Sequence, residues 1–184
     1  MLGVPEAHVA NCAQSVAIVV AAIGLLIVGI GIVPDTLAAT REALRAAARG
    51  NDLILTSGGV SVGEEDHLKQ AVSELGELYL WRLALQPGKP LAFGDVKGVP
   101  WIGLPGNPAA ALITALVVAR PFLLRAQGCD AVLPRPLRLP AGFAWRKANG
   151  RRQYLRARLE PHEDGLRVVL HPRQGSAMLT SASW

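Results

Sequence analysis

The chain has 184 residues, of which 51% are hydrophobic and 18% are charged, and its formal net charge is +5 at pH 7. This length fits one ordinary domain or one domain with a small appendage, and the composition excludes an intrinsically disordered chain. The charge is uneven, because residues 135–173 contain 10 Lys and Arg against 3 Asp and Glu, whereas residues 1–134 contain 9 against 11.

The first notable segment, residues 16–33, is an unbroken run of apolar residues and glycines. Its length fits a minimal transmembrane helix. A buried helix that ends at Gly24, followed by a buried strand over Leu25–Ile30, explains the run equally well. Residues 1–15 contain no Lys or Arg, which argues against a signal peptide or an oriented membrane anchor.

Helices and strands alternate in the following part of the chain. Apolar spacing and flanking glycines predict helices over 34–50 and 64–75, and apolar runs predict strands over 53–56 and 78–85. Such alternation is typical of a sheet covered by helices, with ligands at the carboxyl ends of its strands. We therefore expect an α/β domain of three layers, in which helices cover both faces of a mostly parallel sheet.

Three loops rich in glycine or proline stand at the ends of these elements. Ser57–Gly63 joins a strand to a helix, Gln86–Pro90 carries one charged side chain, that of Lys89, and Leu104–Pro108 precedes a long apolar helix. Backbone N–H groups at a helix start, and a cation on a rigid loop, suit a phosphate or another oxyanion.

Each loop also has a purely structural explanation. Glycine and proline occur in most turns, and Asn107 and Pro108 suit the N-cap and N1 positions of the helix that follows. Asp95–Gly98 is likewise a hairpin turn between strands over 91–94 and 99–103. It is the occurrence of all three loops together that favours a common anion site.

A second, smaller unit is expected over residues 131–184, after a domain over residues 1–130. Three prolines between residues 134 and 140 prevent the preceding helix from continuing. Alternating residues 154–160, the hairpin signal Asp164–Gly165 and the apolar run 166–170 predict short strands.

The chain has two cysteines, Cys12 and Cys129, which lie far apart in the sequence. Their spacing matches neither a metal site nor a disulfide framework. We therefore expect free thiols in a reducing compartment and a cytoplasmic protein, with no membrane partner.

The segments TSGGVSVGEED, QPGKPLAFG and GLPGNPAAA, in this order and at these intervals, resemble the molybdopterin molybdotransferase family, which includes the gephyrin E-domain. The resemblance covers roughly residues 11–184, and Val60–Gly63 favours the transferase over related adenylating and competence/damage-inducible proteins. It corresponds to the C-terminal half of the family and implies a chain truncated at both ends. The first strand and its acidic loop are missing, and the small C-terminal β-barrel is incomplete.

The resemblance implies a step of molybdenum cofactor biosynthesis. Adenylylated molybdopterin would bind, molybdate would be inserted at its dithiolene sulfurs, and AMP would be released with Mg²⁺ present. The expected partners are this pterin nucleotide, a second copy of the chain, and a separate chain that carries the missing N-terminal domains.

The same resemblance assigns site residues motif by motif. Asp66 and Lys89 would be catalytic, Asp66 by organising Mg²⁺ or substrate as a metal ligand and Lys89 by holding an anion. Gln86 stands where some relatives have a second basic residue, which weakens the anion site. The residues expected to hold the pterin phosphate, the pterin or molybdate are Ser57, Gly58, Gly59, Val60, Ser61, Gly63, Gly88, Pro105, Gly106, Asn107 and Pro108.

Two alternatives stay open. The chain could be an inactive fragment that only binds pterin or a partner, or it could be a basic nucleic-acid-binding or interaction module. The second alternative would use a basic surface, although nucleic acid is not an expected partner, because interleaved aromatics are limited to Trp145 and Tyr154 and no recognised binding motif is present. The arginines of this basic surface are Arg151, Arg152, Arg156 and Arg158.

Overall fold

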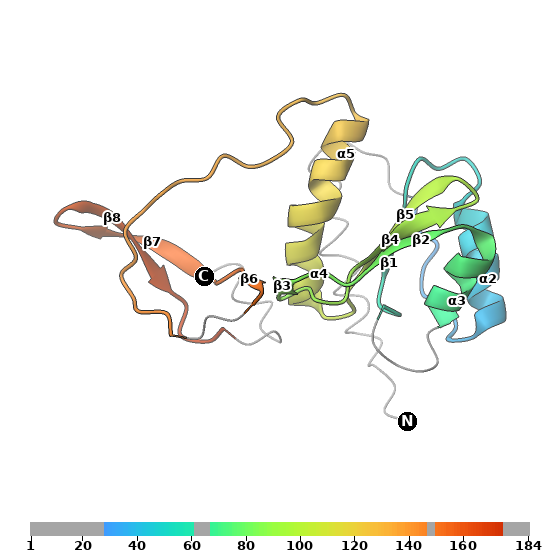
Figure 1. Cartoon of the computed structure of the whole chain (residues 1–184), viewed down its shortest axis with the longest axis horizontal. Helices are drawn as coiled ribbons and strands as arrows, with labels where there is room; N and C mark the ends of the chain where they lie inside the picture. Colours follow the sequence, from blue (N-terminus) through green and yellow to red (C-terminus); the bar gives the residue numbers. More distant parts are fainter. Residues whose placement is uncertain (1–27, 61–66, 147–149, 175–184) are drawn as a thin grey trace.

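The computed structural model of the chain describes residues 28–60, 67–146 and 150–174. A central sheet separates two helical layers: α4 and α5 cover one face, and α2 and α3 cover the other (Figure 1). The expectation of a three-layer α/β domain followed by a small β unit is confirmed.

Helices α2 (Leu37–Ala47) and α3 (His67–Leu75) form one outer layer. The hydroxyl Oγ1 of Thr36 caps α2 by accepting a hydrogen bond from the backbone N–H of Ala39 at 3.2 Å. Leu68, Ala71 and Val72 recur at helical spacing and bury one side of α3 against the sheet.

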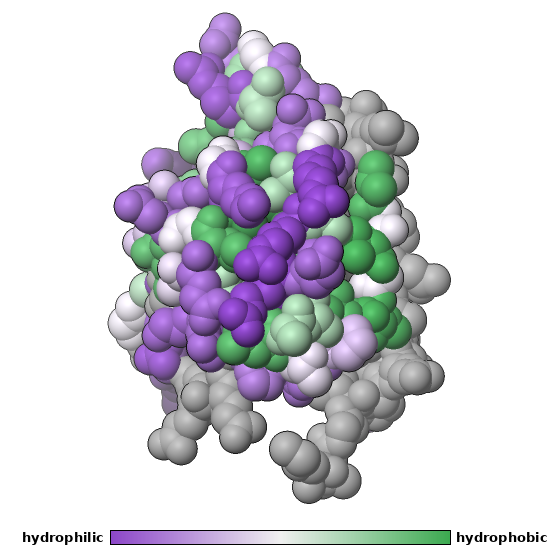
Figure 2. Space-filling model, turned by 90° about the vertical axis from the view of Figure 1, so that its right-hand side faces the viewer, coloured by the Kyte–Doolittle hydropathy of each residue, from purple (hydrophilic) through white to green (hydrophobic). Residues whose placement is uncertain are grey.

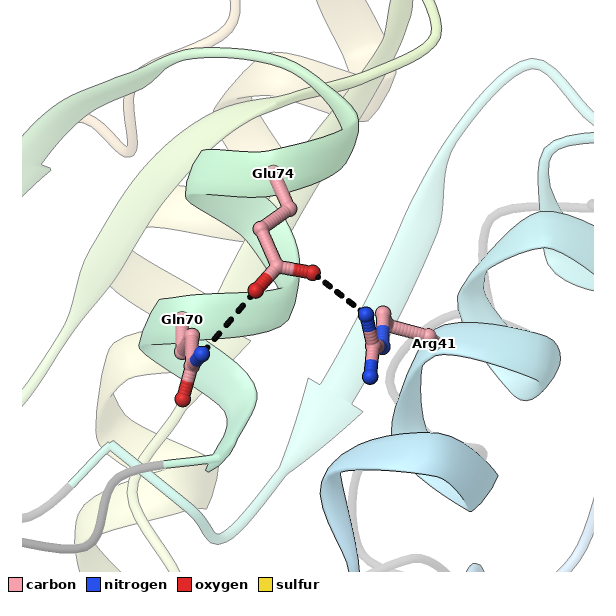
Figure 3. A network of polar contacts seen from close by, with 3 residues as sticks. All are labelled: Arg41, Gln70 and Glu74. Atoms are coloured by element: carbon pink, nitrogen blue, oxygen red, sulfur yellow. Dashed lines mark hydrogen bonds and ion pairs between the residues drawn. The ribbon is translucent and has the colours of Figure 1, made fainter.

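The outer surface of this layer is largely polar. Figure 2 shows a band of hydrophilic residues on this side of the molecule, with hydrophobic residues beside it. Arg41 of α2 forms an ion pair with Glu74 of α3 at 2.9 Å, and Gln70 donates a second hydrogen bond to the same carboxylate (Figure 3). Because these side chains are partly exposed, the pair contributes little to stability.

The sheet has the strand order β1-β5-β4-β2. Its strands are β1 (Ile54–Ser57), β2 (Leu78–Trp81), β4 (Ala92–Val96) and β5 (Val99–Leu104). β1 pairs with β5 in parallel, but β5 with β4 and β4 with β2 are antiparallel. The expectation of a mostly parallel sheet is therefore wrong for the described strands.

The direction of β4 and β5 follows from the turn that joins them. Lys97 and Gly98 both have positive φ, 53° and 81°, as the central residues of a tight two-residue hairpin require. A connection of this length can join only antiparallel strands. The predicted strand over 78–85 is also divided, because Arg82 has φ 113° and the chain resumes as β3 (Leu85–Gln86).

The other helical layer is one continuous helix of three parts: α4 (Pro108–Thr114), the π-helix η1 (Ala115–Ala119) and α5 (Arg120–Ala126). Pro121 has no N–H and its ring would crowd the carbonyl of residue 117 in a regular α-helix, so the wider turn before it relieves that clash. By length and composition, this helix is apolar enough to cross a membrane. Its packing explains that composition, because Ala111, Ala115 and Ala119 lie buried against the sheet.

Two apolar clusters fill the spaces between the layers, because neighbouring β5 residues point to opposite faces. Trp101 packs toward α2 and α3, whereas Ile102 and Leu104 pack toward the long helix. The indole N–H of Trp101 is satisfied by the Thr56 hydroxyl oxygen at 3.1 Å.

The C-terminal unit consists of β6 (Arg152–Gln153) and the hairpin β7 (Ala157–His162) and β8 (Gly165–Leu170). The hairpin projects away from the three layers, and a long connection from α5 arches over to it (Figure 1). The predicted hairpin at Asp164–Gly165 is thus confirmed.

Most of the apolar run 16–33 lies outside the described residues, as does the expected first helix. Residues 28–33 are described and have no regular secondary structure. Val28, Ile30 and Ile32 are exposed there.

A candidate ligand site at two paired strand ends

The first and third predicted loops meet where β1 and β5 end. Ser57 and Leu104 are partners in the parallel ladder, and the backbone N–H of Gly58 donates to the carbonyl of Leu104 at 3.0 Å. The Ser57 hydroxyl then donates to the carbonyl of Pro105 at 3.3 Å. These bonds place both loops at the carboxyl edge of the sheet, where α/β folds bind ligands.

Glycines stand on both sides of the place where the two loops touch. A Cβ atom on Gly106 would lie 3.3 Å from the Cα of Gly58, which is closer than side-chain atoms ordinarily approach. Gly58 and Gly59 also have φ of 90° and 68°, in the region that side chains disfavour. The backbones therefore approach directly, with no side chain between them.

This edge offers backbone donors to a ligand. Within the described ranges, the N–H groups of Gly59 and Gly106 form no hydrogen bond, and both residues are exposed. The N–H of Gly58 is not available, because Leu104 accepts it. The long helix also starts here, so its positive dipole end faces the same edge.

Asn107 and Pro108 take the helix-start positions predicted for them. The Asn107 side-chain oxygen accepts the N–H of Ala110 at 3.1 Å, and Pro108 is buried at the first turn. Their structural role is confirmed, and contact with a ligand stays a prediction.

Val60 contributes differently from the glycines before it. Its side chain is only 2% exposed and belongs to the cluster that contains Leu68 and Trp101. Only its backbone could therefore face a ligand. The predicted site residues Ser61, Gly63 and Asp66 lie outside the described residues.

The second loop packs against the same long helix. Gly88 is buried with φ 113°, and a Cβ atom there would lie 2.5 Å from the Cγ2 atom of Thr114. Thr114 stands six residues after Pro108, or roughly 9 Å along the helix axis. The described contacts thus join Gly88 to α4, but none joins it to Gly58 or Gly106.

Lys89 is exposed at the tip of this loop. Its carbonyl accepts the N–H of Leu83 at 3.0 Å, which closes the loop, and its ammonium forms no ion pair with any described residue. A ligand phosphate could therefore approach this ammonium.

The described part of the chain contains no group of three or more His, Cys, Asp or Glu side chains that could hold a metal ion. Mg²⁺ commonly uses only one or two carboxylates together with substrate phosphates and water. Asp66 therefore stays a predicted ligand.

Shifted pKa values occur at the opposite end of the sheet. The pKa of Tyr79 is raised to about 12, first by its hydrogen bond to Asp95, and the pKa of Asp95 is lowered, first by the backbone N–H of Gly98. These residues lie near the start of β5, whereas the candidate site lies at its end, roughly 17–20 Å away at about 3.3 Å per residue. They stabilise the hairpin rather than tune the site.

The residues that the sequence analysis missed come from the C-terminal unit. β6 pairs in parallel with β3, and Gln153 lies opposite Gln86 in the loop that carries Lys89. Trp145 donates its indole N–H to Gln153. The sequence signal that could have found this contact is Trp145 itself, because a tryptophan N–H usually finds an acceptor when it is buried.

The basic surface is less positive than its sequence implies. Arg158 of this surface forms an ion pair with Glu160, and Arg167 of the neighbouring strand β8 forms one with Asp164. These pairs weaken the argument for nucleic-acid binding by the hairpin.

Comparison with known proteins identifies relatives over both parts of the chain. Residues 5–125 match the family described as "Probable molybdopterin binding domain", and residues 138–184 match "MoeA C-terminal region (domain IV)". The molybdopterin molybdenumtransferase of Haemophilus influenzae is 41% identical over 102 residues, which are 55% of this chain and 25% of that protein. That of Synechococcus elongatus is 34% identical over 138 residues, which are 73% of this chain and 32% of that protein.

Gephyrin of Dictyostelium discoideum is 30% identical over 115 residues, which are 54% of this chain and 16% of that protein. Among solved structures, the molybdopterin biosynthesis moea protein from Pyrococcus horikosii matches with a TM-score of 0.66 and 30% identity, and the match covers 91% of this chain and 40% of that one. The chain thus spans about a third or less of the length of these curated relatives.

Proposed function

Since the chain belongs to the molybdopterin-binding family of molybdenum cofactor biosynthesis, we propose that it binds molybdopterin at the edge where the loops after β1 and β5 meet. The observation that carries this proposal is the direct approach of Gly58 and Gly106, with Ser57 bonded to Pro105. The exposed N–H groups of Gly59 and Gly106 lie at this contact, where a ligand could reach them. Phosphate oxygens are strong acceptors for such groups at a helix start.

The chain's own residues would act by binding and orienting the pterin ligand. The N–H groups of Gly59 and Gly106 would donate to phosphate oxygens, and Lys89 would neutralise a second part of the anion. Ser61, Gly63 and Gly88 would complete the lining through their backbones. Asn107 would border the end where molybdate enters, and the buried Pro105 and Pro108 would fix the backbone path beside it.

We further propose the reaction that the resemblance implies: adenylylated molybdopterin is the substrate, molybdate is inserted at its dithiolene, and AMP leaves. A diphosphate and an oxyanion at one site both need the positive field that this edge supplies. Mg²⁺, when bound, would neutralise diphosphate charge, and Asp66 would hold it. A homodimer, a separate chain with further domains and a cytoplasmic location are parts of the same proposal.

Titration calorimetry on the full chain tests the binding site. Molybdopterin and its adenylylated form should both release or absorb heat, and Lys89→Ala should weaken binding about tenfold, as the loss of a charged hydrogen bond does. Lys97→Asn is the matched control, because it removes one exposed cation in the turn at the other end of β5. Absence of heat, or equal weakening by both substitutions, would refute the site.

Activity is tested separately from binding. The chain should restore molybdoenzyme activity in cells that lack their own molybdotransferase, either alone or together with a chain that supplies the missing domains. Binding without such restoration would identify the inactive binder instead.

A further inference from the structure

The loop that carries Lys89 is paired with the C-terminal unit through its backbone. The N–H of Arg152 donates to the carbonyl of Ala84 at 2.9 Å, and the N–H of Tyr154 donates to the carbonyl of Gln86 at 2.8 Å. β3 and β6 lie side by side at the foot of α4 in Figure 1. Strand β6 of the C-terminal unit therefore pairs with this loop, and the pairing ends at Gln86, three residues before Lys89.

Side chains reinforce this pairing. The indole Nε1–H of Trp145 donates to Oε1 of Gln153 at 2.5 Å, and Nε2 of Gln153 donates to Oε1 of Gln86 at 3.4 Å. An indole can only donate, so it fixes the orientation of the Gln153 amide and turns the NH₂ group toward Gln86. Trp145, Gln153 and Gln86 thus form a directed chain of hydrogen bonds.

The other side of the loop rests on the long helix. Gly88 packs on Thr114, whose side chain is fully buried and bonded to the carbonyls of Ala110 and Ala111. The loop is therefore held between α4 and β6. Lys89 lies between these two supports, and its side chain is exposed.

We propose that Gln153, oriented by Trp145, is a positioning residue that holds the Gln86–Lys89 loop so that the Lys89 ammonium is preorganised for an anionic ligand. This inference rests on the proposed function and adds to it a part for the C-terminal unit. A long cationic side chain loses much freedom on binding, so a loop that is already fixed lowers the cost of binding. Gln153 acts through Gln86 and does not touch the ligand.

Hydrogen exchange in the unliganded full chain tests the positioning directly. Gln153→Ala should speed exchange of backbone amides in residues 82–91 about fivefold, the change expected for one neutral hydrogen bond. Residues 99–104 of β5 should exchange at an unchanged rate. Gln174→Ala is the matched control, because Gln174 bonds to Arg156 and His171 in the same unit and not to the loop.

Calorimetry with molybdopterin then tests whether the positioning acts on Lys89. Gln153→Ala should weaken binding about fivefold when Lys89 is present and should have no further effect in a Lys89→Ala chain, since coupled residues are not additive. Additive weakening of binding, unchanged exchange of the loop amides in Gln153→Ala, or equal effects of Gln174→Ala would overturn this inference and leave the proposed function standing. If the unsubstituted chain binds no molybdopterin, the proposed function is wrong and the inference falls with it.

Discussion

Replacing Gly88 by alanine should destabilise the chain through two separable effects. A Cβ atom would lie 2.5 Å from Cγ2 of Thr114, about 1 Å inside the normal separation of carbon atoms. Overpacking of this kind costs about 1–3 kcal/mol. The φ of 113° costs a residue with a side chain about 1–3 kcal/mol more, so the free energy of unfolding should fall by about 2–6 kcal/mol.

Thr114→Ser separates the two effects, because it removes the Cγ2 atom and keeps the hydroxyl that bonds to Ala110 and Ala111. Alone it should cost about 1 kcal/mol for one buried methyl group. In the double variant with Gly88→Ala the overlap disappears, so the two substitutions should couple favourably by about 1–3 kcal/mol. Urea unfolding followed by circular dichroism measures all four chains. Additive effects, or a Gly88→Ala chain as stable as the unsubstituted one, would refute this account of the loop.

Asn107→Ala should lower the free energy of unfolding by about 1 kcal/mol through loss of the helix cap, whereas Asn107→Asp should keep the cap but weaken molybdopterin binding in calorimetry, because it brings a carboxylate to the anion site. Asp95 has a lowered pKa in the fold, so its ionised form stabilises the hairpin above the unfolded pKa near 3.8 and this contribution is lost as the pH falls through the lower folded value. In Asp95→Asn, the free energy of unfolding measured in urea should no longer show this loss of stability at low pH. The same substitution should bring the pKa of Tyr79 down from about 12 in a spectrophotometric titration. Trp101→Phe should cost about 1–3 kcal/mol in urea unfolding, since it leaves a small cavity and removes the donor that bonds the hydroxyl of Thr56.

Features set by neighbouring residues could be predicted from the sequence. The cap at Asn107 and the first-turn proline at Pro108 depend on side chains within one helical turn of each other, so their pattern is visible in the chain. The meeting of the Ser57 and Pro105 loops was also predictable, because adjacent parallel strands end at one edge.

Features set by distant residues could not be read in the same way. The pairing of Gln86 with Gln153 joins residues 67 positions apart through strands of two residues, which are too short to show any periodicity. The relative directions of the strands could not be predicted for a different reason. The hairpin at Asp95–Gly98 requires antiparallel strands, whereas the alternation of helices and strands elsewhere in the chain favours a parallel sheet.

The π-helix within the long helix also keeps the buried residues of that helix on one face. Buried residues recur at every fourth position, Ala111, Ala115, Ala119 and Leu123, and in a regular α-helix such a series would rotate by about 40° at each step. A wider turn advances each residue through a smaller angle, so the stretch over 115–119 rotates the series back toward the sheet. Deleting one residue there should turn Leu123 away from the sheet, so the shortened chain should unfold at a lower urea concentration.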